Sequence, residues 1–475
     1  MRIVPTFGVV ETWSDNVDPK PHQPPESSWV TSLIPGVRID LAGARVKGML
    51  DAHLDDIRYA NASHLDRTER YLNTFVNADI VGNWLFVDAR ANVDQQNRSA
   101  FGAAATPGAS VNNANRVEIA SYQLAPFIRG RLSDVAVYQL RFNESAVHTS
   151  DSELPDTRTS EWVGRVTSPL ARMGWTLDAR TLTVRNRVVG SLDDSRVRGA
   201  INAAVTDSIR VFASEGYEAT DFGGPPRHTG DTPGAGVEWS PGPRTQLSGV
   251  YERRFFGGSH NVLFTHRTPL TAWRVTSVKD ATVLPAQLTS SRSSIQGLMT
   301  DLLTSAIPDP EARAQAVRRR LEETGISATP AVSSTALTTR PFVYRETTGS
   351  FAFLGRINTA AITVGSREQR HFGDAVGLPA LVGNEDYRQR FFDASFAHKV
   401  SPFTTLTVTG TGWWSESLAI DARRSHEQIY NVFLTTRLGP RSSASVGFRH
   451  TDFTSATEVD SFREKAVYCR VSLRM

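Results

Sequence analysis

Apolar and polar residues alternate along this chain over unusually long stretches. Between residues 45 and 55, Val46 and Leu50 fall on one parity, whereas Lys47 and Asp51 fall on the other. The same alternation recurs in residues 85–94, 136–143, 196–205 and 406–414. Because successive side chains of a strand point to opposite faces, the pattern predicts strands with one apolar and one polar face.

The length of these runs favours strands that cross a membrane. Soluble strands average about 5–6 residues, whereas a tilted strand needs about 9–11 to span a bilayer. The chain is 40% hydrophobic with a mean hydropathy of −0.29, and it has no apolar stretch of the roughly 18 residues that a membrane helix requires. A soluble β-sandwich or propeller is the alternative, but no propeller repeat is visible.

Short and long connections follow one another along the chain. Tight turns are predicted near residues 41–43, 81–83, 241–243 and 438–440, and long polar loops at 15–27, 98–114, 217–230 and 372–385. Short periplasmic turns and long external loops are typical of outer-membrane barrels. We therefore expect an all-β fold: an antiparallel up-and-down transmembrane barrel of about 22 strands, within a range of 18–24, in the outer membrane of a Gram-negative bacterium.

The polar parity predicts the lining of the lumen, and the apolar parity predicts the face toward lipid. The nine Trp residues are predicted to sit where strands meet turns, as an interfacial aromatic belt would require, although packing at sheet edges is an alternative explanation. Ala203 is expected to face lipid near the midplane. The residues predicted to line the lumen are Arg45, Lys47, Asp88, Arg90, Asn92, Arg141, Arg196, Arg198, Asn202, Glu252, Arg254, Thr407, Thr409, Arg437 and Arg449.

One segment, residues 291–335, breaks the alternation. Apolar residues at helical spacing predict a first helix over 294–305, and Asp309, Pro310 and Gly325 predict the cap, first turn and end of a second. The insertion either plugs the lumen or caps the barrel from outside, and both readings stay open. Its predicted plug or gate residues are Leu298, Leu302, Asp309, Arg313, Arg318, Arg319 and Arg320.

Other classes of function find little support. The net charge of +3 gives no case for nucleic acid. The histidines are scattered singly, and the adjacent acids Asp55–Asp56 and Asp193–Asp194 point to opposite strand faces, so we expect no enzyme, catalytic residue, cofactor or metal site. The single cysteine, Cys469, excludes an intrachain disulfide and is expected to face outward. We treat residues 1–475 as one barrel, exported with a signal that has been removed.

Three segments resemble one family. Residues 11–16 (ETWSDN), 112–132 (NNANRVEIASYQLAPFIRGRL) and 309–325 (DPEARAQAVRRRLEETG) are similar to segments of PEP-CTERM system-associated outer-membrane β-barrel proteins. The similarity extends over nearly the whole chain. One departure is the last residue, Met475, where such barrels usually end in an aromatic residue that the assembly machinery reads.

The resemblance implies a porin-like exit channel for an exopolysaccharide. Its partners would be the lipid bilayer, lipopolysaccharide, the polymer in transit, a periplasmic polysaccharide-export protein and the barrel-assembly machinery. No functional residues are established for the family. A structural or assembly barrel with a filled lumen is the alternative function, and an outer-membrane enzyme is the second alternative.

Overall fold

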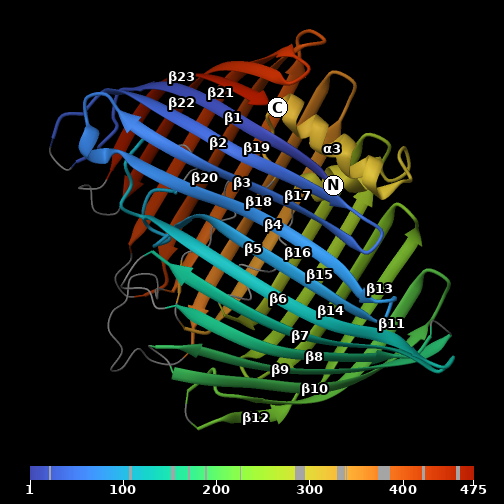
Figure 1. Ribbon diagram of the computed structural model, residues 1–475. Helices are drawn as coiled ribbons and strands as arrows, with labels where there is room; N and C mark the ends of the chain where they lie inside the picture. Colours follow the sequence, from blue (N-terminus) through green and yellow to red (C-terminus); the bar gives the residue numbers. More distant parts are fainter. Residues whose placement is uncertain are drawn as a thin grey trace.

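The computed structural model forms one continuous antiparallel sheet that closes on itself (Figure 1). It describes residues 1–20, 23–105, 110–150, 156–169, 172–187, 190–224, 226–283, 295–328, 337–338, 340–372, 386–419, 423–455 and 461–475. Each strand pairs with the next along the chain, except that β12 and β13 both pair with β11, and the last strand pairs with the first through nine residue pairs, from Thr6–Arg474 to Ser14–Ala466. The predicted closed barrel is therefore confirmed.

The strands are long, as the alternation predicts. They are β1 Arg2–Ser14, β2 Ser28–Ala42, β3 Val46–Tyr59, β4 Arg67–Val81, β5 Leu85–Asn97, β6 Arg116–Leu132, β7 Ala136–Thr149, β8 Thr157–Thr167, β9 Met173–Asn186, β10 Gly190–Ala204, β11 Ile209–Thr220, β12 His228–Asp231, β13 Gly234–Gly242, β14 Thr245–Arg254, β15 Gly257–Arg267, β16 Thr271–Thr282, β17 Phe342–Leu354, β18 Asn358–His371, β19 Tyr387–Lys399, β20 Thr404–Ser417, β21 Arg424–Gly439, β22 Ser442–Ser455 and β23 Phe462–Arg474.

Two of the 23 strands share one place in the barrel. β12 and β13 both pair with β11, along successive parts of its length. Pro233 lies between them and has no backbone N–H to give to the ladder, so the strand is interrupted there. The barrel therefore has 22 strand positions, the number that the sequence predicts.

The two ends of the barrel differ in the length of their connections. At one end the strands are joined by short turns, such as residues 82–84 and 133–135, and both chain termini lie there (Figure 1). The long connections, including 15–27 and 98–115, lie at the other end. By the usual rule for such barrels, the short-turn end is the periplasmic mouth and the long-loop end faces outward. Residues 373–385 of the predicted loop 372–385 lie outside the described residues.

The outer face of the sheet is apolar and exposed. Val197 and Ile201 of β10 are 53% and 62% exposed, whereas Asp194 on the opposite face is 1% exposed. Eight of the nine Trp residues are exposed, and only Trp413 is buried. Contact with lipid requires an apolar band on the outer face. It also requires a closed sheet, because lipid offers no hydrogen-bond partner to an unpaired strand edge. Cys469 is exposed, as expected.

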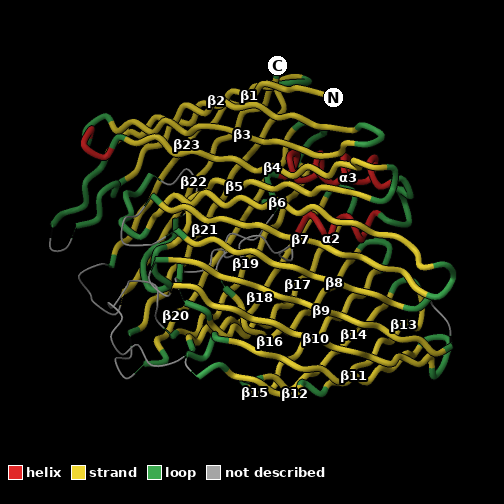
Figure 2. Tube along the Cα trace, turned by 60° about the horizontal axis from the view of Figure 1, so that its bottom comes forward, coloured by secondary structure: helices red, strands yellow, loops and turns green. Residues whose placement is uncertain are grey.

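The helical content is small. A 3-10 turn, η1, spans Ser63–Leu65, and the insertion between β16 and β17 holds α2, Ile295–Leu303, and α3, Pro310–Thr324. Both helices appear within the ring of strands, drawn in red in Figure 2. None of the helices in the described part of the chain is long and apolar enough to cross a membrane.

The depth predicted for Ala203 is wrong. Ala203 lies on the outer face, yet it is the last residue but one of β10, so it sits near the periplasmic mouth and not at the midplane. The middle of the strand is Val197. Depth was misjudged because alternation specifies the face of a residue and not its height.

Replacing Val197 by Arg should destabilise the barrel. A guanidinium at mid-depth on the lipid face costs about 2–4 kcal/mol, whereas Asn202→Arg on the lumen side of the same strand should cost little. Unfolding and refolding titrations of both variants in lipid vesicles measure the difference. Equal free energies of unfolding for the two variants would contradict the facing assignment.

Candidate functional site

The helical insertion lies at the periplasmic mouth, inside the barrel. β16 ends at the outer, long-loop end, yet α2 and α3 contact residues at the opposite end of the strands. α2 touches β16 and β17, and α3 touches β20. Figure 1 shows α3 beside the two chain termini. The described helices therefore lie in the lumen and do not cap the barrel from outside. Residues 291–294 and 329–335 of the predicted insertion lie outside the described part.

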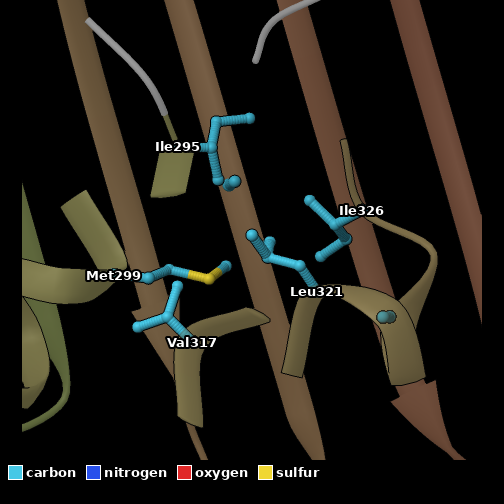
Figure 3. Packing of buried hydrophobic residues seen from close by; sticks show 7 residues of the cluster. Ile295, Met299, Val317, Leu321 and Ile326 are labelled. Carbon is cyan, nitrogen blue, oxygen red and sulfur yellow. The ribbon is translucent and has the colours of Figure 1, made fainter. Parts of the chain in front are cut away.

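The two helices share a small apolar core (Figure 3). Ile295 and Met299 of α2 and Val317 and Leu321 of α3 are all buried in it, together with Ile326. From the barrel wall this cluster receives only two alanines, one from β18 and one from β19. The helices thus pack mainly on each other, and the wall offers them a flat surface.

The other face of α2 also rests on alanines. Leu298 and Leu302 pack against Ala272 of β16 and Ala352 of β17. Next to this contact, Arg274 donates to the Asp301 carboxylate at 2.7 Å. Leu298 and Leu302, predicted as plug residues, therefore fix α2 to the wall.

The ends of α3 are those that the sequence predicts. Asp309 caps the helix, its carboxylate accepting a 2.7 Å hydrogen bond from the backbone N–H of Ala312, and Pro310 occupies the first turn. Gly325 ends the helix with φ 67°, the left-handed conformation that glycine adopts without a steric penalty. Its Cα faces Phe433 of β21 so closely that a Cβ would lie 2.6 Å from that ring.

Ion pairs join α3 to the rim of the periplasmic mouth. Glu322 accepts from Arg474 of β23 at 2.8 Å and lies 3.8 Å from Arg38 of β2. Glu323 accepts from Lys399 of β19 and from Arg437 of β21, both at 2.9 Å. Two adjacent carboxylates thereby connect one helix to four strands.

The field around Glu323 favours its charged form. Partial burial alone would raise the pKa of this carboxyl, but the hydrogen bonds and charges of Lys399 and Arg437 outweigh burial and lower the pKa. Nearby, Arg320 donates to the carbonyl oxygen of Gly355 at 2.8 Å and to the Thr359 hydroxyl at 3.0 Å. Thr407, buried on β20, donates to the carbonyl oxygen of Thr324.

The predicted gate arginines divide into two groups. Arg320 binds the wall, and Arg313 donates to the Ile307 carbonyl at 3.0 Å within the insertion. Among the described residues no ion pair is formed by Arg318, which is half-buried, or by Arg319, which is exposed. Helical spacing does not identify a charge partner on another strand, so the main contacts of Glu322 and Glu323 could not be predicted from the sequence.

A second segment, which its sequence does not mark as lumenal, also enters the lumen. The β5–β6 connection was predicted to be an external loop at 98–114. Instead, the Ala104 backbone N–H donates to Glu427 of β21 at 2.7 Å, and Phe101 packs edge-on against Tyr387 of β19 at 6.5 Å between ring centroids. The loop thus reaches inner-face residues on strands far from its own.

Buried polar groups hold this loop in place. Ser110 donates to Glu464 of β23, and Arg449 of β22 binds the Glu464 carboxylate at 3.1 Å. Ser14 of β1 donates to the same carboxylate at 2.9 Å, and Tyr59 of β3 donates to the Ser110 carbonyl at 2.9 Å. Because a buried carboxylate is costly unless paired, this group of contacts is a firm attachment.

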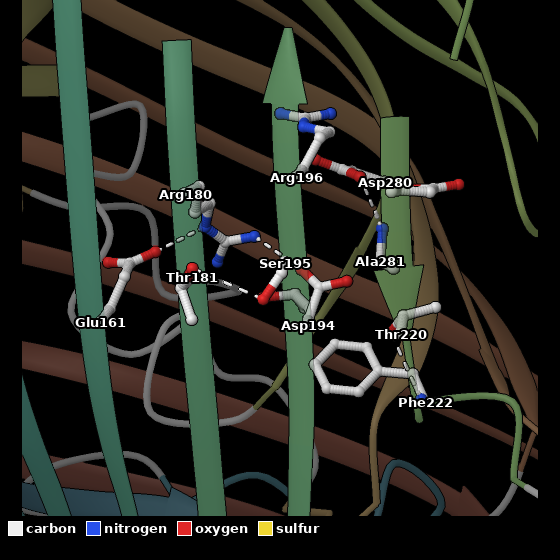
Figure 4. Close-up of polar contacts among 12 residues, drawn as sticks. Glu161, Arg180, Thr181, Asp194, Ser195, Arg196, Thr220, Phe222, Asp280 and Ala281 are labelled. Carbon is white, nitrogen blue, oxygen red and sulfur yellow. Dashed lines mark hydrogen bonds and ion pairs between the residues drawn. The ribbon is translucent and has the colours of Figure 1, made fainter. Parts of the chain in front are cut away.

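On the other side of the barrel, charged side chains form a ladder across neighbouring strands. Arg180 of β9 donates to Glu161 of β8 at 2.5 Å and reaches Asp194 of β10 at 3.3 Å (Figure 4). Further along, Arg198 of β10 donates to Asp178 at 2.6 Å. The remaining ladder contacts are Arg141–Asp88, Arg196–Glu252, Arg198–Glu252, Arg254–Glu218 and Arg254–Asp280.

The interior therefore has two unlike sides. The described parts of the insertion and of the β5–β6 loop rest mainly on β16–β23 and β1–β3. The ladder lies chiefly on β7–β14, and its members Arg180, Arg196 and Arg198 keep 20–28% of their side-chain surface exposed. The ladder wall thus offers accessible donors and acceptors to a solute.

Most predicted lumen residues lie on the inner face. Asp88, Arg141, Arg196, Arg198, Glu252 and Arg254 belong to the ladder. Lys47, Thr407 and Arg437 contact α3, and Arg449 holds the β5–β6 loop. Arg90 stacks over Phe75, 5.2 Å from the ring centroid, and Asn92, Asn202 and Thr409 are half-buried on inner positions of β5, β10 and β20.

Arg45 is the exception among them. It lies exposed in the β2–β3 turn, one residue before β3 begins, and its carbonyl accepts from the Asp79 N–H at 2.8 Å. The predicted strand began too early, because a turn residue fits the alternation as well as a strand residue does. Within the described residues no three His, Cys, Asp or Glu side chains are grouped to hold a metal.

Replacing Met299 by Ala should loosen the helical insertion. Met299 is fully buried between α2 and α3, and such a truncation costs about 2–5 kcal/mol in a packed core. Hydrogen exchange should therefore speed up in α2 and α3 and stay unchanged in the strands. Gln315→Ala, at an exposed position of α3, is the matched control. If α3 exchanges equally fast in both variants, the shared core does not hold it.

Comparison with known proteins bears on the fold. No family model and no curated protein matches the chain, so the resemblance to the PEP-CTERM-associated barrels stays a prediction. Among solved structures, the FrpB iron transporter from Neisseria meningitidis (F5-1 variant) aligns with a TM-score of 0.50 at 10% identity, over 99% of this chain and 82% of that one.

Two further solved structures align with lower TM-scores. The siderophore receptor PirA from Pseudomonas aeruginosa aligns with a TM-score of 0.45 at 9% identity, over 100% of this chain and 80% of that chain. A mutant ferric enterobactin receptor from the same organism aligns at 0.42 and 8% identity, over 100% and 80%. At 10% identity, the alignment with the FrpB iron transporter informs on the fold alone. Together with the exposed apolar band, the closed sheet makes this chain a bacterial outer-membrane β-barrel of 22 strands.

Proposed function

We propose that this barrel is a gated outer-membrane channel in which the α2–α3 insertion closes the periplasmic mouth. The observation that carries the proposal is the attachment of α3, because Glu322 and Glu323 bind four basic side chains on the rim. Partly exposed ion pairs are individually weak and reversible. A helix held in this way is suited to leave the mouth and return.

For the cargo we propose an exopolysaccharide on its way out of the cell. The ladder wall supports this, because its guanidinium and carboxylate groups supply many hydrogen bonds that a hydroxyl-rich polymer can exchange step by step. The sequence resemblance points to the same cargo. A periplasmic polysaccharide-export protein would then deliver the polymer to the mouth. The similarity to an iron transporter concerns the fold and is no evidence that this barrel transports iron.

A second candidate function is a structural or assembly barrel whose lumen stays filled. The apolar core of Ile295, Met299, Val317 and Leu321 favours it, because buried apolar contacts resist repeated opening. In this case the β5–β6 loop would act as a second permanent filling. The two functions differ in one measurable property, the ability of the barrel to pass ions when α3 is released.

Replacing Glu322 and Glu323 together by Gln should increase conductance in planar bilayers. The change keeps size and removes the negative charge, so the rim cations lose their partners. A hydrogen bond to a charged group stabilises the closed state by roughly 1–3 kcal/mol, so the loss of these charges should raise the fraction of open barrels about tenfold or more. A soluble polysaccharide added on the periplasmic side should then block the current.

Glu311→Gln is the matched control on the same helix. Glu311 lies 3.5 Å from Lys47, and both side chains are more than half exposed, so this pair should contribute little. Silent membranes with the double variant, and with a barrel lacking residues 309–325, would exclude a channel and leave the structural role. Current without polysaccharide block would retain the channel and exclude the polymer as cargo.

The contribution of Glu323 to closure of the mouth should depend on pH only in the acid range. Because the folded-state pKa of Glu323 is lowered, its stabilisation of the closed state is complete above the ordinary carboxyl pKa of about 4.3 and is lost as pH falls through the lowered value. Wild-type current should thus stay constant from pH 8 to 5 and rise below about pH 4. A rise between pH 7 and 5 would show that another group controls the mouth.

A further inference from the structure

The outer wall of the barrel carries a groove on its extracellular half. It has a volume of about 760 Å³ and crosses β2–β7. Small side chains form its floor, among them Pro35, Ala52 and Ala120, whereas Leu54 and Tyr122 stand higher and are about 45% exposed. These residues share the outward parity with the lipid-facing residues of their strands. The groove is therefore open to the membrane and separate from the lumen.

A second groove of about 530 Å³ lies beside the first. Tyr122 and His148 line both grooves, and their rings are in edge contact at 6.1 Å between centroids. They form a ridge between the two hollows. Leu124 and Ala146 line the second hollow together with polar residues. Glu144 is paired with Leu124 at the same depth, and Arg158 is paired with Ala146 nearer the outer end.

Charged groups surround the upper ends of both grooves. Arg70 binds Glu118 at 2.6 Å beside the first, and Arg158 binds Glu144 beside the second. Both guanidinium groups remain 68% exposed, and Arg185, also exposed, lines the second groove.

The depth of this polar rim can be read from the strands. Arg70 is the fourth residue from the outer end of β4, and Glu118 is the third of β6. Arg158 is the second residue of β8 and Arg185 the last but one of β9, so these guanidinium groups lie where lipid headgroups of the outer leaflet begin. Glu144 lies deeper, level with Leu124.

We propose that the paired grooves bind one lipopolysaccharide molecule. Acyl chains of its lipid anchor lie in the two hollows on either side of the Tyr122–His148 ridge, and its phosphates contact Arg70, Arg158 and Arg185. Two adjacent hollows suit a lipid with several chains on one headgroup. Several guanidinium groups in reach of one headgroup suit one that carries more than one phosphate.

The test uses the whole barrel, purified in detergent and stripped of lipid. Purified lipopolysaccharide is titrated in, and binding is followed by native mass spectrometry and by the midpoint of thermal unfolding. One variant fills the first groove (A52F/A120F), and another removes the three cations (R70Q/R158Q/R185Q). Each should weaken binding about tenfold or more while the barrel keeps its heat-modifiable migration on gels.

Matched controls lie on the outer face away from the grooves. Ala203→Phe adds the same ring near the periplasmic end of β10, and Arg463→Gln removes an exposed guanidinium paired with Asp452 at 2.9 Å. Both should bind lipopolysaccharide like wild type. Equal affinity for phosphatidylglycerol, or equal loss in the controls, would overturn the proposal and leave an unspecific lipid shell.

Discussion

The pairing of backbone polar groups within the sheet is the constraint on which this structure depends. In hydrocarbon an unpaired N–H or C=O has no water to bind, so a membrane sheet is stable only without edges. β1 and β23 meet this requirement by pairing along nine residues, although they lie at opposite ends of the chain. Closure in turn divides every strand into a lipid face and a lumen face. The alternation of apolar and polar residues in the sequence follows directly from that division. The interruption at Pro233 is tolerated because Thr232 and Arg253 supply hydrogen bonds around it.

Closure also determines the chemistry of the interior. Side chains on the inner face of a wide barrel meet each other across adjacent strands, and charges there must be paired to be tolerated. The chain has 47 Arg and only 5 Lys. A guanidinium carries five donors in a planar fork, so one arginine can connect acids on two strands, as Arg198 does with Asp178 and Glu252. The ladder thus stiffens the wall, and because its members stay partly exposed, the same groups are accessible from the lumen.

The sequence predicts features that depend on neighbouring residues and misses those that depend on distant ones. The strands follow from alternation, and α3 follows from Asp309, Pro310 and Gly325, because each signal is contained within a few residues. The sequence does not determine the position of the insertion, because it depends on Glu322 and Glu323 meeting cations that lie far away in the chain, such as Arg38 and Arg474. The β5–β6 loop was placed outside for the same reason, since Ser110 and Glu464 are separated by 354 positions. A polar loop that enters the lumen and one that projects into water have the same composition.

The way in which α2 and α3 are held argues that they move as one body. Their largest buried side chains pack between the helices, so this core need not be broken when the pair leaves the wall. The wall contributes mostly alanines, namely Ala272, Ala352, Ala361 and Ala397, which do not interlock with a helix as larger side chains would. Apart from Leu298 and Leu302, which rest on two of these alanines, the described contacts between pair and wall are polar: the two glutamates, Arg320, Thr407 and Asp301 with Arg274. Water can replace each of these contacts when the pair separates from the wall, whereas it cannot replace the apolar contacts between the helices. Undocking of the intact pair is therefore less costly than its unfolding, and the periplasmic mouth is built to open without loss of the helices.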